Sequence, residues 1–299
     1  MKILYIWLLL EADSMLLERI KLVTSAKKSL LGRKFRHINA LSRDWFEIIM
    51  SNLHCCDSEN LDVSDRFTKV RPLFTMLNDR FQAYAPHSEK HSVDEAMVPY
   101  FGRHGCEQFI RGKPIKYGYK LWVDATSSGY VIWMEPYQGA ISVIPEQYRS
   151  LDLGPSVVLQ YADILSCLGE FPHHIFFDNF FTTVPLLDEL KKRRLKGTGT
   201  IRDNVNSKCP LENTACMNKK QCGSFDSKVT KDKSIIIAKW HDNSIVMYPD
   251  FKNTEENPQP HCMYAYNTGM GGVDHSDQNI SLSRINLRGI NCTFLLLHI

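Results

Sequence analysis

The order of apolar segments after residue 93 constrains the fold of this chain more than any other feature of its sequence. Residues 93–102 (VDEAMVPYFG) read as a strand, and residues 115–139 read as a hairpin that turns at residues 126–129. A helix at residues 156–165, a short buried strand at residues 173–181 and a helix at residues 183–197 follow. This order predicts a sheet with both parallel and antiparallel neighbours, covered by helices.

The segment before residue 93 has a different character. Its apolar residues recur at helical spacing, for example Trp45, Ile48 and Ile49, with Ser42 as a predicted N-cap. We therefore expect an α+β or α/β chain, in which an all-helical region (1–90) precedes an RNase H-like mixed sheet flanked by helices (91–299). A second hairpin at residues 234–249 places a hairpin-containing insertion around residues 200–262.

Composition excludes several classes of protein. The formal net charge is only +3, so a nucleic-acid partner has to be argued from where the charges lie. The nine cysteines are scattered and include no C-x-x-C pair, which argues against a disulfide framework and against a zinc site. The sequence has no cleavable signal and no apolar run long enough to span a bilayer. We expect no membrane association and a compartment that keeps thiols reduced, either the cytosol or the nucleus.

Three aspartates lie at the edges of predicted core elements. Asp94 is in the first strand, Asp178 ends the apolar run HHIFF, and Asp274 opens a helix-like stretch behind a glycine pair. In an RNase H-like sheet the first and fourth strands are neighbours, so Asp94 and Asp178 should meet. Asp274 would approach from a helix that also carries Asp277 on the same face. Oxygen ligands of this kind suit Mg²⁺ or Mn²⁺, and two such ions can promote phosphodiester displacement.

Each of these acids also has a structural interpretation. Asp94 can be an ion-paired surface residue, Asp178 a turn residue, and Asp274 a helix cap. Two other acids compete for the site. Asp124 is assigned to a hairpin turn, and Glu95 is expected to point away from Asp94 because successive strand residues alternate.

Basic residues gather after the first predicted strand, interleaved with Tyr117 and Tyr119. Such a set can contact DNA phosphates and stack on bases, or it can be an ordinary basic loop. The candidate DNA-binding residues are Arg103, Arg111, Lys113, Lys116 and Lys120. A separate basic run at residues 191–194 resembles a nuclear import signal, but a solvated helix C-terminus is the preferred interpretation.

Four long blocks occur in one order along the chain: residues 91–122, 130–140, 176–202 (FFDNFFTTVPLLDELKKRRLKGTGTIR) and 266–282 (YNTGMGGVDHSDQNISL). Together they closely resemble the piggyBac transposases, especially the piggyBac transposable element-derived proteins of animals. The resemblance covers roughly residues 40–288, and within it residues 42–62 and 65–81 resemble the helical region that precedes the catalytic core of that family.

The resemblance implies a metal-dependent DNA transposase. Asp94, Asp178 and Asp274 match the three carboxylates that bind two Mg²⁺ ions in the family, and Asp277 matches a further acid. The implied partner is double-stranded DNA at transposon ends and TTAA targets. The resemblance is also compatible with a homodimer. Relative to the family pattern, the chain is expected to be C-terminally truncated and to lack the cysteine-rich end-recognition domain.

Two other hypotheses stay open at the level of sequence. The chain can be a catalytically silent, transposon-derived protein that binds DNA or full-length relatives. It can also be a fragment without a stable fold, because the apolar segment FLLLHI at the C-terminus would expose hydrophobic surface if its partner helices were missing.

Overall fold

The computed structural model describes residues 55–56, 61–100, 102, 104–111, 115–139, 142, 144–169, 172–203, 209–241, 245–251 and 261–282. Most of the predicted helical region 1–90 lies outside these residues. Within it, helix α4 (Arg71–Ala83) buries one apolar face, formed by Leu73, Phe74, Leu77 and Phe81.

A mixed six-stranded sheet forms the centre of the described structure, as predicted. Its order is β2-β3-β1-β5-β6, and β4 also pairs with β3. The pairs β1–β5 and β5–β6 are parallel, whereas β2–β3 and β3–β4 are antiparallel. The strands are β1 (Lys90–Pro99), β2 (Glu107–Phe109), β3 (Tyr117–Thr126), β4 (Val131–Pro136), β5 (His174–Phe177) and β6 (Lys196–Gly199).

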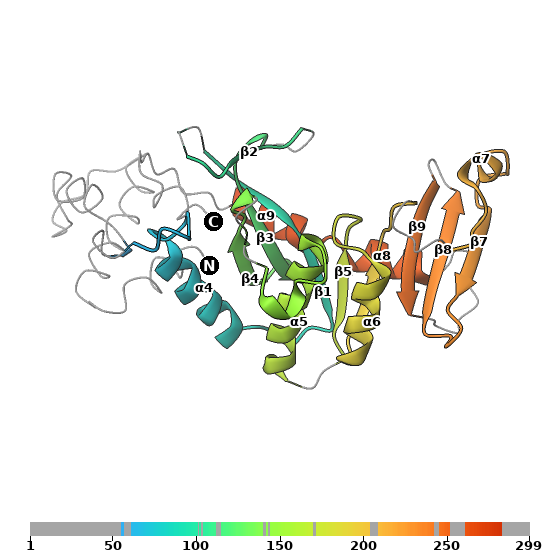
Figure 1. The fold of residues 1–299 in the computed structure, drawn as a ribbon, viewed down its shortest axis with the longest axis horizontal. Coiled ribbons are helices and arrows are strands. Elements are labelled where there is room, and N and C mark those ends of the chain that lie inside the picture. The colour runs from blue at the N-terminus through green and yellow to red at the C-terminus, as the bar shows by residue number, and fades with distance from the viewer. Residues whose placement is uncertain are drawn as a thin grey trace, which may run out of the picture. The chain divides into compact units, whose positions relative to one another are not determined.

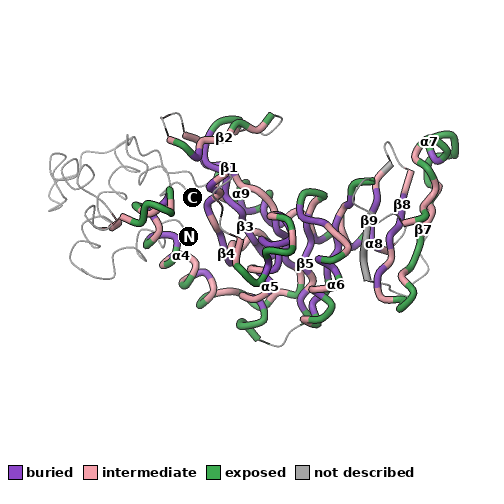
Figure 2. The backbone as a smooth tube through the Cα atoms, viewed as in Figure 1, coloured by how far each residue is buried: buried purple, intermediate pink, exposed green. Residues whose placement is uncertain are grey.

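Helices cover both faces of this sheet (Figure 1). On one face, α5 (Leu153–Leu168) and α6 (Val184–Lys192) share a core with Ile175 and Phe177 of β5. On the other face, α8 (His261–Gly269) brings Gly269 against the ring of Phe176 so closely that a Cβ there would lie 2.3 Å from it. Since β5 is covered on both faces, its near-continuous apolar sequence is explained, and Figure 2 shows it buried.

Several local predictions are confirmed. Strand β3 ends at Thr126, where the hairpin turn begins, and the amide of Gly129 donates to the carbonyl of Thr126 at 2.8 Å. Helix α6 begins after Thr183, whose side chain accepts from the amide of Leu186, and it has a proline in its first turn. These caps fix where the helix starts after the DNFFT segment.

A second, three-stranded antiparallel sheet lies in the range assigned to an insertion. It has the order β7-β8-β9 and consists of β7 (Phe225–Val229), β8 (Ile235–His241) and β9 (Ile245–Phe251). The short helix α7 (Thr214–Met217) precedes it. The β8–β9 hairpin was predicted from sequence, whereas β7 was not.

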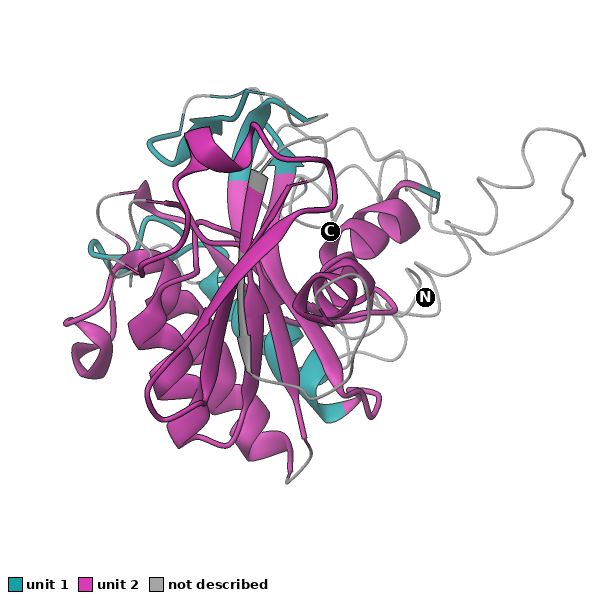
Figure 3. Cartoon of the chain, turned by 90° about the vertical axis from the view of Figure 1, so that its right-hand side faces the viewer, with its two compact units in different colours: residues 1–83, 98–119, 282–299 teal, residues 84–97, 120–281 magenta. Residues whose placement is uncertain are grey.

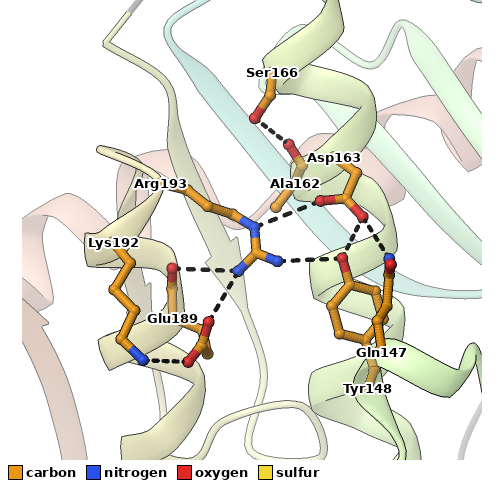
Figure 4. A network of polar contacts seen from close by, with 8 residues as sticks. All are labelled: Gln147, Tyr148, Ala162, Asp163, Ser166, Glu189, Lys192 and Arg193. Atoms are coloured by element: carbon orange, nitrogen blue, oxygen red, sulfur yellow. Dashed lines mark hydrogen bonds and ion pairs between the residues drawn. The ribbon is translucent and has the colours of Figure 1, made fainter.

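The basic run at residues 191–194 ends α6, as the preferred interpretation predicted, and its side chains form ion pairs. Lys191 Nζ lies 2.6 Å from Asp232 Oδ2. The guanidinium of Arg193 pairs with Asp163 of α5 at 3.5 Å and with Glu189 at 3.3 Å (Figure 4). Arg193 also donates to the hydroxyl of Tyr148, in the 3₁₀ helix η2 (Glu146–Tyr148), at 3.2 Å. The run therefore ties α6 to α5.

The chain divides into two compact units (Figure 3). One comprises residues 1–83, 98–119 and 282–299, and the other residues 84–97 and 120–281. The carboxylates predicted to bind metal all belong to the second unit. No helix among the described residues is both long enough and apolar enough to cross a bilayer.

Candidate active site

The parallel pairing of β1 and β5 brings two of the predicted aspartates together. The register pairs Val93 with Phe177, so the next residues, Asp94 and Asp178, follow side by side. Carboxylate oxygens of Asp94, Glu95 and Asp178 all lie within 4.8 Å of one another. The predicted meeting of Asp94 and Asp178 is therefore confirmed.

Asp178 lies just past the end of β5, in a tight turn. Its Oδ1 accepts from the amide of Phe180 at 2.8 Å, and its carbonyl accepts from the hydroxyl of Thr182 at 2.7 Å. Burial raises the pKa of Asp178 above its ordinary value, and the nearby charge of Glu95 raises it further. The amides of the turn and Arg202 oppose this shift. The turn holds the carboxylate in place, and burial and Glu95 disfavour its charge, which is the setting that favours binding of a cation.

Glu95 was expected to point away from Asp94, yet its carboxylate lies within 4.8 Å of that of Asp94. Asp94 Oδ1 accepts from the amide of Glu95 at 2.7 Å, which draws the Asp94 side chain along the strand toward its neighbour. The two carboxylates thereby come within reach of one ion despite the alternation of the strand. The sequence signal for Glu95 is that it directly follows another acid. The two acids lie where their strand, β1, continues beyond the end of its shorter partner, β5.

Lys120, a candidate DNA contact, faces Glu95. Its Nζ lies 2.9 Å from Glu95 Oε1, and the side chains are only 11% and 17% exposed. The ammonium also lies 3.9 Å from the ring centroid of Trp122 and 5.0 Å from that of Phe180. Lys120 is a strand residue inside an aromatic enclosure, and in this arrangement its charge neutralises Glu95.

Asp274 lies in the first turn of α9 (Gly272–Leu282). The start of α9 packs on the strands: the amide of Val273 donates to Ser92 Oγ at 3.2 Å, and a Cβ at Gly272 would lie 2.4 Å from the carbonyl oxygen of Thr126. Asp274 and Asp277 are both exposed, and neither belongs to the described carboxylate cluster. The helix arrives on the strand that carries Asp94, as predicted, but the third carboxylate stands outside the group.

The other basic candidates lie on or next to the β2–β3 hairpin. Arg111 and Lys116 are exposed, whereas Arg103 and Lys113 lie outside the described residues. A role of these residues in DNA binding stays a prediction.

Asp124 was assigned to a turn, and the structure instead places it inside β3 with no exposed surface. Neither of its carboxyl oxygens has a hydrogen-bond partner of acceptable geometry among the described residues. Burial raises the pKa of Asp124 well above its ordinary range, and the neighbouring Tyr161 hydroxyl offsets this only in part. Burial therefore disfavours the charged form of Asp124, which lies in the core of the sheet.

Comparisons with known proteins agree with this geometry. Residues 27–296 match the family described as Transposase IS4. The human PiggyBac transposable element-derived protein 2 is 41% identical over 269 residues, which cover 84% of this chain and 45% of that protein. The human PiggyBac transposable element-derived protein 3 is 41% identical over 267 residues, which cover 84% and 44%. The chain thus spans less than half the length of these curated relatives.

One solved structure supports the fold. It is described as a cryo-EM structure of a piggyBac transposase synaptic complex with hairpin DNA, and it matches with a TM-score of 0.75 at 22% identity. The match covers 91% of this chain and 56% of that one. The mixed sheet with its flanking helices is therefore a piggyBac transposase-like fold.

Proposed function

Because the chain belongs to the piggyBac-derived branch of the DDE transposases, we propose that it is a DNA transposase core that cleaves and joins phosphodiester bonds with divalent metal ions. The observation that carries this proposal is the convergence of Asp94, Glu95 and Asp178 within 4.8 Å, where β5 ends beside the middle of its parallel partner β1. Use of divalent metals is general in this family.

The donor set fits the expected metal. Carboxylate oxygens are the ligands that Mg²⁺ and Mn²⁺ prefer, and burial together with the charge of Glu95 makes the Asp178 carboxylate costly to ionise without a cation. Asp94 and Asp178 would hold the ions, and Asp274 and Asp277 would contribute from α9. When bound, the two ions supply the positive charge that clamps the attacking and leaving oxygens of a phosphodiester displacement.

The protein's own residues position this site. The turn at Asp178 is closed by the Phe180 amide and the Thr182 hydroxyl, and it fixes one carboxylate just past the carboxyl end of β5. The Lys120 ammonium neutralises Glu95 and keeps the local negative charge low enough for the fold to tolerate it.

The proposed substrate is double-stranded DNA at transposon ends with TTAA targets, and the basic residues after β1 would contact its phosphates. The piggyBac transposase of the matched structure is described in a complex with hairpin DNA. We also propose that the protein forms a homodimer and is located in the nucleus.

The decisive experiment is nicking of supercoiled plasmid by the purified chain with Mg²⁺ or Mn²⁺. Asp178→Asn removes one carboxylate charge at nearly constant size and should abolish nicking. Asp188→Asn, the same change at an exposed position of α6, should leave nicking intact. Mn²⁺ binding followed by electron paramagnetic resonance gives a readout that does not depend on turnover.

A second function is favoured by the exposure of Asp274 outside the carboxylate cluster. In this alternative the chain binds DNA or a related transposase without cutting. A folded protein that binds DNA, but neither binds Mn²⁺ at the cluster nor nicks plasmid, would select it over the transposase core.

A further inference from the structure

Two large aromatic side chains stand exposed at the outer end of the β2–β3 hairpin. Phe109 and Tyr117 are directly opposite each other across the antiparallel pair, so their side chains share one face. Their ring centroids lie 4.7 Å apart, and the residues are 56% and 48% exposed. A pair of rings in contact with each other and open to solvent offers a flat apolar surface.

The inner end of the same hairpin is fixed in an aromatic core. Tyr119 is buried, and its ring stacks on Tyr100 at 4.6 Å and meets Phe67 edge-on at 5.4 Å. Gly118, between the exposed and buried tyrosines, has φ +154°, and a Cβ there would lie 1.9 Å from the carbonyl oxygen of Val98. The exposed pair therefore sits on an anchored strand, which lowers the conformational entropy lost when a ligand binds.

The surroundings of the pair are basic. Arg111 follows β2, and Lys116 precedes β3. Both side chains are exposed, and neither has an ion-pair partner in the described part of the chain. From residue 101 to residue 119 the sequence contains one acid, Glu107, against Arg103, Arg111, Lys113 and Lys116. Flat aromatic rings beside uncompensated cations are complementary to a strand of nucleic acid, whose bases stack while its phosphates bind the cations.

We propose that Phe109 and Tyr117 form a stacking platform for an unpaired DNA base, with Arg111 and Lys116 holding the adjoining phosphates. The proposal rests on the DNA-directed function above and names the form of DNA this surface selects. A base within intact duplex is stacked on its neighbours and cannot cover the two rings, so the platform should favour DNA with unpaired bases.

The test compares two fluorescein-labelled duplexes of the same length, one fully paired and one with four central unpaired bases, by fluorescence anisotropy with Ca²⁺ in place of Mg²⁺. The wild-type chain should bind the unpaired probe more tightly. Stacking of one base contributes roughly 5- to 150-fold in affinity. The double substitution Phe109→Ala/Tyr117→Ala should remove this preference and leave binding to the paired duplex nearly unchanged.

Matched variants separate the platform from general effects. Phe225→Ala removes an equally exposed ring, 56%, from β7 and should keep the preference. Tyr117→Phe keeps the ring and should keep it as well. Quenching of 2-aminopurine placed among the unpaired bases should appear with wild type and disappear with the double alanine variant.

Absence of a preference in the wild-type chain, or its persistence in the double alanine variant, would overturn the platform. So would a variant whose only defect is a changed sedimentation coefficient, because the rings would then be a protein contact. Metal-dependent nicking that Asp178→Asn abolishes, without any preference for unpaired bases, leaves the transposase proposal standing and rejects the platform. A ring-dependent preference for unpaired bases, without metal-dependent nicking, leaves the platform standing and rejects the transposase proposal.

Discussion

Asp178 and Asp124 follow the same kind of sequence, an apolar run that ends in an aspartate, yet they lie in opposite surroundings. Asp178 is partly exposed beside Asp94 and Glu95, where backbone amides and a cation can stabilise its charge. Asp124 is fully buried, and neither of its carboxyl oxygens has a described partner. Local sequence alone does not distinguish an aspartate of the carboxylate cluster from an aspartate buried in the core.

Where each strand stops accounts for the difference. Strand β5 ends at Phe177, so Asp178 lies just past the carboxyl end of its strand. Strand β3 continues to Thr126 and pairs Asp124 with Trp133 of β4, so Asp124 stays inside the sheet. Asp178 reaches solvent because its strand has ended, whereas Asp94 and Glu95 join it from within β1.

The polar neighbours differ accordingly. Near Asp124 runs a buried chain of neutral groups, in which the Tyr161 hydroxyl lies 2.8 Å from His91 Nδ1 and His91 Nε2 lies 3.1 Å from His173 Nδ1. Burial lowers the pKa of His91 to about 4. The cluster has a cationic partner in Lys120, whereas burial disfavours the charged forms of both Asp124 and His91.

The largest contrast is expected in catalysis. Asp178→Asn should lower metal-dependent nicking by more than about 100-fold, because even the loss of groups that merely support metal ligands costs 10- to 100-fold. Asp124→Asn should leave nicking within about threefold, since Asp124 lies outside the carboxylate cluster and burial disfavours its charged form. Initial rates of plasmid nicking measure both, and equal losses in the two variants would remove the distinction drawn here.

The next effect concerns the ion pair that balances the cluster. Lys120→Met should lower the free energy of unfolding by about 3 kcal/mol, because it leaves the Glu95 carboxylate buried without its partner. The double variant Lys120→Met/Glu95→Gln should recover most of this loss. Urea unfolding of the metal-free protein gives the values, and a Lys120→Met variant as stable as wild type would show that Glu95 is solvated by other means.

The pH dependence of stability should reveal Asp124. Its pKa is raised in the folded state, so above its unfolded value near 3.8 unfolding releases a proton and stability falls as pH rises toward the folded pKa. Within this window the slope is about 1.4 kcal/mol per pH unit. Asp124→Asn should remove the slope. Urea unfolding between pH 5 and 8 tests this, and an unchanged slope in the variant would assign it to other groups.

His91 should act in the opposite direction. Its pKa falls from 6.5 to about 4 on folding, so unfolding takes up a proton and stability is lost as pH drops from 6.5 to 4. His91→Gln should reduce this acid sensitivity by up to about 1.4 kcal/mol per pH unit. The exposed His87 provides the matched control, His87→Gln. Thermal melts across this range compare the two, and identical profiles would exclude His91.

Much of the sheet was predictable because its elements are locally encoded. The turn at residues 126–129, the apolar run of β5 and the capped start of α6 each carry a signal within a few residues. The meeting of Asp94 with Asp178 followed from assigning their strands to adjacent positions in a known layout. Strand β7 was missed because its alternation is weak, and most of its residues are partly or fully exposed.

The parts of the site that could not be predicted depend on long-range contacts. The proximity of the Glu95 and Asp94 carboxylates was missed because strand alternation does not take into account the hydrogen bond from the Glu95 amide to the Asp94 side chain. Lys120 read as part of a basic loop, since its partners Glu95 and Phe180 come from other strands and turns. Asp124 read as a turn residue because the end of β3 lies two residues beyond it.

The parallel pairing of β1 with β5 also has a consequence for how the protein folds. The two strands are far apart in the chain, and the β3–β4 hairpin between them needs only local contacts. Local hairpins and helices form faster than pairings that close long loops. A chain that has collapsed around the hairpin and α5 would hold much of its secondary structure and no carboxylate cluster. During refolding, the appearance of divalent-metal binding would therefore report when β1 and β5 pair and the longest loop in the sheet closes.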